Sequence, residues 1–230
     1  MNVAIILAGG IGSRMNLKDF PKQYLNVGGT PIIGYCLNTF QQHEEIDSIY
    51  IVADKTWEDF LGKWMSQNQI NKFGGFVTPG ESRQLSIYNA LLAVEKEFQP
   101  EDNIIIHDAA RPFVTKELLT VGLRELGSSE GVMPVLPAKD TFYQSDDRKV
   151  ISALLPREKL FAGQAPEFFK LGKYVEIHKK MSKDEILKIN GSSEIAYKSG
   201  LKVSLIAGEE RNFKVTTPGD IELMKTFLGL

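Results

Sequence analysis

The chain alternates between short runs of apolar residues and longer stretches in which apolar residues recur every three or four positions. Short runs are typical of buried β-strands and the longer stretches of amphipathic helices. This pattern predicts strands at residues 3–8, 46–54, 74–77, 103–110, 131–138 and 201–208, and helices at 30–40, 55–65, 82–98, 115–126, 170–181, 192–199 and 217–228. Strands that alternate with helices form parallel sheets covered by helices. We therefore predict an α/β protein with a mainly parallel sheet.

Two helix starts carry recognisable signals. Thr30 is followed by Pro31, and Thr217 by Pro218, which places a capping hydroxyl before a proline at the first helical position. Asp220 lies in the first turn of the last helix, where the helix dipole favours a carboxylate. We expect Thr30 and Thr217 to be the N-caps of their helices.

The alternation of predicted strands and helices stops at residues 139–169, where the sequence offers no long helix to connect two parallel strands. Two extended segments surround the turn "SDDR", which predicts a protruding β-arm. Neither an internal repeat nor a low-complexity linker divides the chain. We predict one domain over residues 1–230 that carries this arm.

Composition narrows the function. The 230 residues have a formal charge of −2 and 43% apolar content, which supports a real core and gives no basic surface for nucleic acid. No apolar run approaches the about 18 residues of a membrane span. Cys36 is the single cysteine, which excludes an intramolecular disulfide and fits a reducing cytoplasm. We expect a cytoplasmic protein without nucleic-acid or membrane partners.

The stretch "IILAGGIGSRM" combines a strand with a glycine turn, a pattern that allows backbone N–H groups to approach a phosphate. The third glycine of the dinucleotide fingerprint would fall on Met15, and no Gly-Lys-Ser/Thr follows, so neither a Rossmann fingerprint nor a Walker A loop is present. What remains is a turn that carries its own cation, Arg14, with Lys18 and Lys22 beyond it. The alternative is a turn that only reverses the chain.

A second candidate group is "IIIHDAARPF". Asp108 ends a buried strand at the edge where open α/β sheets bind ligands, and it could hold a metal or form a structural salt bridge with Arg111. The basic residues Arg14, Lys22, Arg83 and Lys214 occur in or beside loops that follow predicted strands. Several cations and one aspartate suit a polyphosphate with Mg²⁺, because phosphoryl displacement depends on alignment and charge neutralisation. The three histidines have no ligand spacing, which makes a zinc site improbable.

Seven motifs then occur in a familiar order: "LAGGIGSRM", "FPKQYL", "PGESRQLSIYNAL", "HDAARPF", "DT" at Asp140–Thr141, "GQAPEFF" and "NFKVTTPGDI". In order and spacing the chain resembles the family of 2-C-methyl-D-erythritol 4-phosphate and ribitol-5-phosphate cytidylyltransferases over almost its whole length. The resemblance implies a Rossmann-like nucleotidyltransferase fold. It also implies a reaction in which CTP and an alditol phosphate give a CDP-alditol and pyrophosphate.

The resemblance assigns a role to each candidate residue. It implies that Arg14, Lys22 and Lys214 are catalytic and that Asp108 positions Mg²⁺. The implied CTP-binding residues are Leu7, Ala8, Gly9, Gly10, Gly12, Gly80, Arg83 and Ser86, and the implied second-substrate residues are Arg111, Asp140, Thr141, Arg157 and Asn190. In relatives the arm crosses to a second subunit, which implies a homodimer in which Arg157 serves the neighbouring site.

One departure concerns the second substrate. Relatives carry an acidic "TD" pair before the penultimate strand, where a gap-free comparison puts Asn190 and Gly191 in this chain, so the carboxylate is lost. The segment "LPREKLFAGQAPEFF" looks closer to the ribitol-phosphate branch than to the methylerythritol branch, whose members more often read "ALTPQ" there. Ribitol 5-phosphate is therefore the expected substrate, and methylerythritol 4-phosphate the alternative. A dinucleotide-dependent oxidoreductase and a non-catalytic nucleotide-binding protein stay open as remote alternatives.

Overall fold

The computed structural model describes residues 1–10 and 20–230. Within these ranges the core of the molecule is an eight-stranded sheet with the order β10-β7-β11-β6-β1-β4-β5, and β12 pairs with β7 beside this path. Its strands are β1 (Asn2–Leu7), β4 (Ser48–Val52), β5 (Phe73–Val77), β6 (Asn103–Asp108), β7 (Gly131–Pro137), β10 (Phe161–Gly163), β11 (Glu167–Lys170) and β12 (Val203–Ala207).

The sheet is mainly parallel, as predicted. Strands β6, β1, β4 and β5 run parallel to one another, and β12 runs parallel to β7. The exception at the centre is β11, which lies antiparallel between β6 and β7. Its two phenylalanines, Phe168 and Phe169, are fully buried on opposite faces of the sheet. This strand therefore belongs to the core and not to the arm, in which the sequence analysis had placed it.

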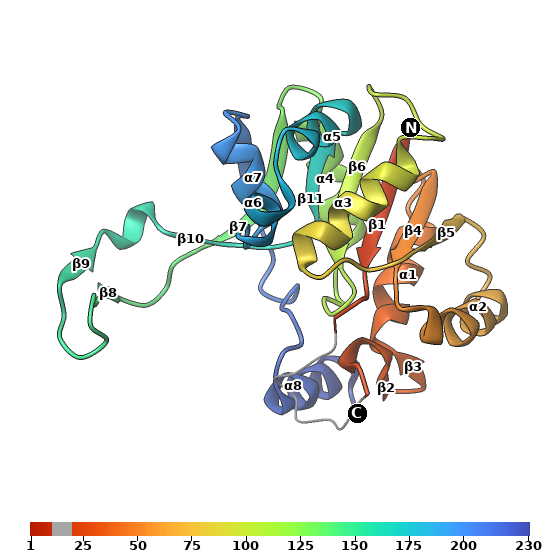
Figure 1. Ribbon diagram of the computed structural model, residues 1–230. Helices are drawn as coiled ribbons and strands as arrows, with labels where there is room; N and C mark the ends of the chain where they lie inside the picture. The colour runs from red at the N-terminus through yellow and green to blue at the C-terminus, as the bar shows by residue number, and fades with distance from the viewer. Residues whose placement is uncertain (11–19) are drawn as a thin grey trace.

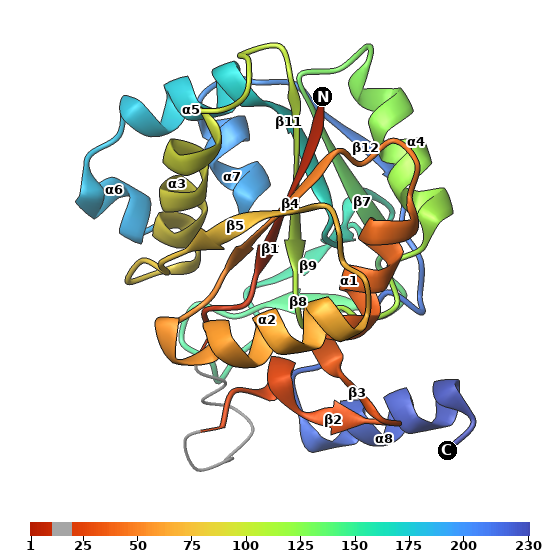
Figure 2. The ribbon, with the colours of Figure 1, turned by 90° about the vertical axis from the view of Figure 1, so that its right-hand side faces the viewer.

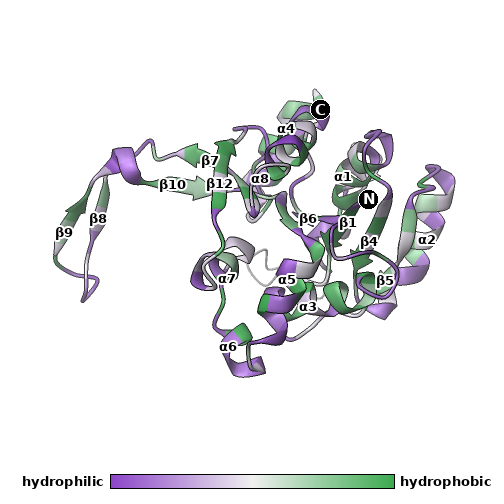
Figure 3. Cartoon of the chain, turned by 90° about the horizontal axis from the view of Figure 1, so that it is seen from above, coloured by the Kyte–Doolittle hydropathy of each residue, from purple (hydrophilic) through white to green (hydrophobic). Residues whose placement is uncertain are grey.

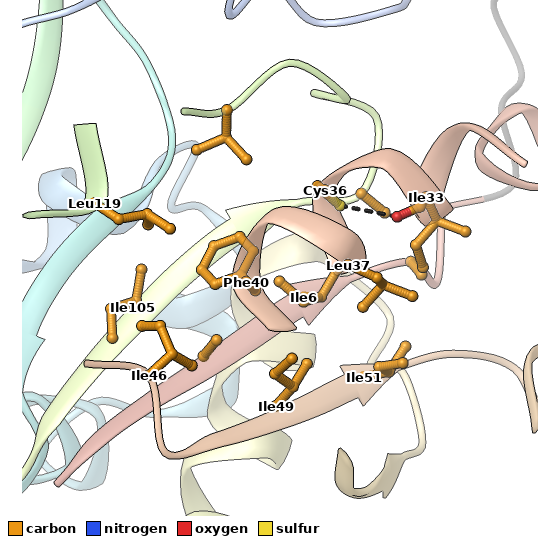
Figure 4. Close-up of a cluster of buried hydrophobic side chains, with 14 of the residues drawn as sticks. Ile6, Ile33, Cys36, Leu37, Phe40, Ile46, Ile49, Ile51, Ile105 and Leu119 are labelled. Atoms are coloured by element: carbon orange, nitrogen blue, oxygen red, sulfur yellow. Dashed lines mark hydrogen bonds between the residues drawn. The ribbon is translucent and has the colours of Figure 1, made fainter. Parts of the chain in front are cut away.

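Helices cover both faces of the sheet (Figure 2). One face packs against α1 (Ile32–Gln42), α2 (Glu58–Gln67) and α4 (Lys116–Leu126), and the other against α3 (Arg83–Val94), α5 (Leu171–Lys179) and α7 (Ser192–Lys198). Alternate residues of β1 serve the two cores, because successive side chains of a strand point to opposite faces. In Figure 4, Phe40 and Leu37 of α1 pack over Ile6, Ile49 and Ile105 of the sheet.

Cys36 belongs to the same core. Its Sγ lies 3.1 Å from the carbonyl oxygen of Ile33, and burial raises the pKa of the thiol to about 12 (Figure 4). A thiol with this pKa is inert near neutral pH. Cys36 therefore fills the core and takes no part in chemistry.

The two expected helix caps have different outcomes. Thr217 and Asp220 form a capping box at the start of α8 (Pro218–Leu228), as predicted. The prediction for Thr30 was wrong, because Pro31 is the N-cap of α1 and makes no side-chain cap bond. Thr30 and Pro31 instead form β3 (Thr30–Pro31), which pairs with β2 (Asn26–Val27) across a turn at Gly28 and Gly29, both in left-handed conformation.

The remaining short elements are η2 (Lys22–Tyr24), η3 (Lys55–Trp57), η4 (Arg157–Lys159) and α6 (Lys183–Leu187). The sequence pattern did not predict α6, which begins with a capping box at Ser182 and Glu185. None of the helices in the described ranges has the length and apolar character needed to span a bilayer.

A hairpin projects from the body of the molecule (Figure 1). It consists of β8 (Phe142–Gln144) and β9 (Ala153–Leu155), which pair antiparallel around the predicted "SDDR" turn. The arm is shorter than the predicted 139–169, because β10 and β11 pair within the main sheet. Apolar residues mark β9 and part of β8 in Figure 3, although within residues 1–10 and 20–230 these strands pair only with each other.

Candidate active site

Two pockets meet at the carboxyl ends of β1 and β6. The first pocket has a volume of about 480 Å³ and is lined by Leu7, Gly9, Gly10, Lys22, Gln23, Val52, Gly80, Glu81, Ser82, Arg83, Ser86, Asp108, Ala110 and Lys214. The second pocket has a volume of about 550 Å³ and is lined by Arg83, Asp108, Arg111, Met133, Gly163, Gln164, Ala165, Glu167, Asn190, Gly191, Ser193, Glu194, Tyr197, Val203, Leu205 and Lys214. Arg83, Asp108 and Lys214 line both pockets and therefore form the boundary between them.

Asp108 is the centre of this boundary. It ends β6, where its register partner on β1 is Leu7, so both residues lie at the ligand-binding edge predicted for an open sheet. Its carboxylate accepts hydrogen bonds from Arg83 Nε at 3.1 Å and Lys214 Nζ at 3.0 Å, and Arg111 Nε lies 3.6 Å away. The predicted salt bridge with Arg111 is therefore present, as one contact within a larger cluster of charges.

The cluster fixes the charge of its members. Burial opposes ionisation of Asp108, but the positive charges of Arg83, Lys214 and Arg111 outweigh it and hold the pKa of this carboxyl far below its usual range. Burial also lowers the pKa of Arg111, although Asp108 opposes that shift. The boundary therefore holds a permanent carboxylate surrounded by three cations, a setting that attracts phosphate groups to both pockets.

The glycine turn after β1 lies against the first pocket. A Cβ on Gly9 would come within 2.6 Å of the Pro79 ring, so only glycine fits there. Gln23 donates hydrogen bonds to the carbonyl oxygens of Ala8 and Gly10, and Tyr24 donates to that of Ala8. These bonds fix the start of the turn beside the pocket. The candidates Gly12 and Arg14 lie outside the described residues.

The opposite wall of the first pocket comes from the start of α3. Ser82 is the N-cap of this helix, and the backbone N–H of Gly80 donates to Ser86 Oγ at 3.0 Å. A Cβ on Gly80 would lie 2.9 Å from the backbone nitrogen of Ser86, so the loop approaches the helix more closely than another residue allows. Lys22 enters from η2 and is 9% exposed. The predicted CTP-binding residues that line this pocket are Leu7, Gly9, Gly10, Gly80, Arg83 and Ser86, whereas Ala8 does not line it.

The second pocket brings together Arg111 and Asn190 of the predicted second-substrate residues. Arg111 donates from Nη1 to the carbonyl oxygen of Asn212 at 2.7 Å, which holds its side chain at the pocket edge. Asn190 and Gly191, where the carboxylate of relatives is lost, line this pocket, and two other carboxylates, Glu167 and Glu194, line it as well. The carboxylate of Glu194 accepts hydrogen bonds from the Asn190 backbone N–H and from Lys198 Nζ.

Asp140, Thr141 and Arg157 are not part of either pocket. All three are exposed at the base of the arm, and Arg157 donates to the carbonyl oxygen of Lys139. The described residues of one chain therefore do not bring them to Asp108.

Sequence reasoning missed Gln23 and Glu167. Gln23 stands in "FPKQYL", where only the fold reveals that its amide supports the glycine turn. Glu167 was included in the arm, and its position opposite Ile106 of β6 depends on the antiparallel register of β11. The adjacent phenylalanines Phe168 and Phe169 were a signal for a strand buried on both faces, but not for the contacts of Glu167.

The site can be tested for a divalent metal. Among the described residues, no group of three or more His, Cys, Asp or Glu side chains forms a metal cage. Mg²⁺ is commonly held by one or two carboxylates together with substrate phosphates and water. Asp108 fits that pattern, because a carboxylate has about four lone-pair positions and two are used by Arg83 and Lys214.

Comparison with known proteins agrees with this geometry. A ribitol-5-phosphate cytidylyltransferase of Vibrio parahaemolyticus is 31% identical over 228 residues, covering 99% of this chain and 96% of that protein. A 2-C-methyl-D-erythritol 4-phosphate cytidylyltransferase of Clostridium botulinum is 36% identical over 231 residues, covering 99% and 97%. The crystal structure of 4-diphosphocytidyl-2C-methyl-D-erythritol synthase from Anaerococcus prevotii superimposes with a TM-score of 0.85 at 25% identity, covering 100% of this chain and 96% of that one.

The family model described as 2-C-methyl-D-erythritol 4-phosphate cytidylyltransferase matches residues 2–229, nearly the full chain. Relatives with either substrate name are aligned over almost their whole length. These matches favour the nucleotidyltransferase over the oxidoreductase and the non-catalytic binding protein. The chain belongs to the family of 2-C-methyl-D-erythritol 4-phosphate cytidylyltransferases and is a CTP-dependent cytidylyltransferase.

Proposed function

We propose that the chain joins CTP and an alditol phosphate, with D-ribitol 5-phosphate as the preferred substrate, to give a CDP-alditol and pyrophosphate. The observation that carries this proposal is the shared boundary of the two pockets. CTP occupies the first pocket and the alditol phosphate the second, so the reacting phosphates meet beside Asp108 and Lys214.

In this reaction a phosphate oxygen of the alditol phosphate attacks the α-phosphorus of CTP. The new oxygen–phosphorus bond forms as the bond to the β-phosphate oxygen breaks, and pyrophosphate leaves with the bonding electron pair. The chain supplies alignment and positive charge, the main requirements of phosphoryl transfer. Lys214 at the boundary neutralises charge on the α-phosphate, and Lys22, with Arg14 from the glycine turn, neutralises the departing pyrophosphate.

Asp108 holds Mg²⁺ in this proposal. When bound there, Mg²⁺ would neutralise negative charge on the phosphates of CTP. Asp108 also keeps Lys214 and Arg83 directed at the boundary, because both cations contact its carboxylate. The nucleotide lies along Gly9, Gly10, Gly80 and Ser86, with Leu7 and Ala8 at the end of the strand beneath it.

The choice of ribitol 5-phosphate rests on the arm sequence and on the second pocket. Relatives with either substrate name match this chain at similar identity, 31% and 36% in the two cases above. Overall identity therefore does not select between the substrates. In place of the acidic pair that is usual in relatives, this pocket presents Asn190 and Gly191, which suits a different pattern of substrate hydroxyl groups.

The arm serves a homodimer in this proposal. Its exposed apolar side chains are Phe142, Tyr143, Val150, Ile151 and Leu154, which are 45–68% exposed in the single chain. An isolated two-stranded hairpin is marginally stable in water, and a second copy of this chain is the occupant that covers these residues. Asp140, Thr141 and Arg157 then reach the second pocket of the partner.

The test is an assay of pyrophosphate release with CTP, Mg²⁺ and a panel of alditol phosphates. We expect the highest kcat/KM with ribitol 5-phosphate. A higher value for methylerythritol 4-phosphate would reverse the substrate choice, and the absence of turnover with every member of the panel would refute the proposed function.

A further inference from the structure

Glu167 is a buried carboxylate that the proposed reaction does not use. It is 6% exposed and lies at the start of β11, where it faces Ile106 across the antiparallel ladder. Ile106 and Asp108 are two residues apart on β6, so their side chains share a face of the sheet. Glu167 and Asp108 are therefore diagonal neighbours on the face that carries α3 and α7.

Arg83 connects these two carboxylates. Its Nε contacts Asp108 at 3.1 Å, its Nη2 contacts Glu167 Oε1 at 3.5 Å, and its Nη1 donates to Ser192 Oγ at 2.7 Å. The contact with Glu167 is the longest of the three. The guanidinium therefore keeps two shorter contacts when the charge of Glu167 is removed.

The two oxygens of Glu167 differ in how fully they are used. Oε2 accepts hydrogen bonds from the backbone N–H of Ser193 at 2.7 Å and from its hydroxyl at 2.6 Å. Among the described residues, Oε1 has only the long contact with Arg83. The side chain of Glu167 lines the second pocket, and a carboxylate oxygen with unused lone pairs can accept a hydrogen bond from a ligand donor.

We propose that Glu167 is a specificity-determining residue for the second substrate, with Oε1 accepting a hydrogen bond from a hydroxyl group of the alditol. The Glu167 carboxylate, which lies on β11, replaces the carboxylate that relatives carry at the positions of Asn190 and Gly191. The inference rests on the proposed function, because it requires the alditol phosphate in the second pocket. In this proposal Arg111 and Lys214, which also line the pocket, bind the phosphate group of the substrate, and Glu167 accepts from one of its hydroxyl groups.

Selectivity among substrates follows from the free-energy cost of burying Glu167 Oε1 against a ligand that offers it no hydroxyl donor. A hydrogen bond to a charged group contributes about 1.5–3 kcal/mol, which corresponds to about 10–150-fold in affinity. A substrate that lacks the matching hydroxyl leaves Oε1 without a ligand donor beside its long contact with Arg83, and is rejected by about this factor. The remaining hydroxyl groups of the substrate do not contribute to this discrimination.

The experiment compares the wild type with Glu167→Gln in the pyrophosphate assay, using ribitol 5-phosphate and analogues that each lack one hydroxyl group. We expect Glu167→Gln to raise the KM for ribitol 5-phosphate by about 10-fold or more and to leave the KM for CTP within about threefold. One deoxy analogue, rejected by the wild type, should be accepted by the variant almost as well as the full substrate. Glu176→Gln, which removes an exposed carboxylate on α5, is the charge control.

A second variant tests whether the carboxylate can be moved. Gly191 has an extended backbone conformation, and a Cβ there would meet no atom within 4 Å. The double substitution Glu167→Gln with Gly191→Asp should recover part of the lost discrimination and change which deoxy analogue is rejected. Recovery of this kind is not expected for a residue that only supports α7.

The possible results separate the two proposals. Suppose that the wild type turns over the alditol phosphates and that Glu167→Gln has the same ratios of kcat/KM among the analogues as the wild type. This result would overturn the role of Glu167 and leave the proposed function standing. Equal increases in both KM values, with a lower melting temperature, would also overturn it and leave Glu167 as a structural residue. No turnover by the wild type with any alditol phosphate would refute this inference together with the proposed function.

Discussion

Replacing Asp108 with asparagine tests the charge cluster most directly. The substitution keeps the size of the side chain but removes the carboxylate that faces Arg83, Lys214 and Arg111 at 3.0–3.6 Å. Removing one partner of a buried ion pair destabilises a protein by about 3–5 kcal/mol. For a chain of this size each kcal/mol lowers the melting temperature by about 2–4 °C, so we expect a decrease of about 6–20 °C.

The turnover of Asp108→Asn should decrease by more than its loss of folded protein explains. If Asp108 holds Mg²⁺ at the boundary, turnover measured well below the melting temperature should decrease by about 10²-fold or more. Affinity for CTP without metal should be unchanged or higher, because the variant removes a negative charge beside the triphosphate. Calorimetry, equilibrium binding and the pyrophosphate assay measure these three effects separately.

A matched control is Glu130→Gln, which removes a half-buried carboxylate at the molecular surface that is paired with Lys173 at 2.7 Å. Ion pairs at the surface add little to stability, so its loss should lower the melting temperature much less than Asp108→Asn does. If Asp108→Asn behaves like this control, with wild-type turnover, the reasoning from the buried cluster is refuted.

Three further predictions concern catalysis, assembly and pH. Alanine at Lys22 or Lys214 should lower kcat more than it raises the KM for CTP, whereas a change in KM alone would make these lysines ground-state binders. An inactive Arg157→Ala chain mixed with an inactive Lys22→Ala chain should regain activity through heterodimers; no recovery despite proven subunit exchange would exclude action across the dimer. Burial lowers the pKa of His107 and His178 to about 4, against about 6.5 when unfolded. The unfolded chain thus binds more protons between these values, and the free energy of unfolding should decrease as pH falls from 6.5 toward 4. Urea titrations at pH 7 and 5 measure this decrease, and equal midpoints with equal slopes would contradict it.

The sequence predicted those parts of the fold that depend on local signals. The isoleucine run Ile104–Ile106 identified the central strand β6, and Thr217 with Asp220 identified the start of α8. The position of β11 was not predictable in this way. Its four residues enter the sheet antiparallel between β6 and β7, and that placement depends on pairing with strands distant in sequence.

The residues of the candidate site show the same difference between local signals and long-range pairing. Asp108, Arg83 and Lys214 could be proposed because each stands at a strand end or in a loop that follows one, and parallel strands bring these ends together. Glu167 could not, because its contact with Arg83 depends on the register of β11. The sequence comparison found a carboxylate missing at Asn190 and Gly191, and only the folded chain reveals another one in the same pocket.

The arm leaves and re-enters the sheet at a single point. Pro137 at the end of β7 is the register partner of Phe161 at the start of β10, and the Ala138 N–H donates to the carbonyl oxygen of Leu160. The excursion between them is therefore a closed insertion, joined at its base like the loop of a hairpin. A two-residue turn such as Asn-Gly could connect β7 directly to β10 without altering the sheet. The sheet and the pocket floor at Asp108 can therefore fold without this insertion, whereas the insertion carries Asp140, Thr141 and Arg157, so that in the proposed dimer its loss would remove both the subunit contact and the residues supplied to the partner.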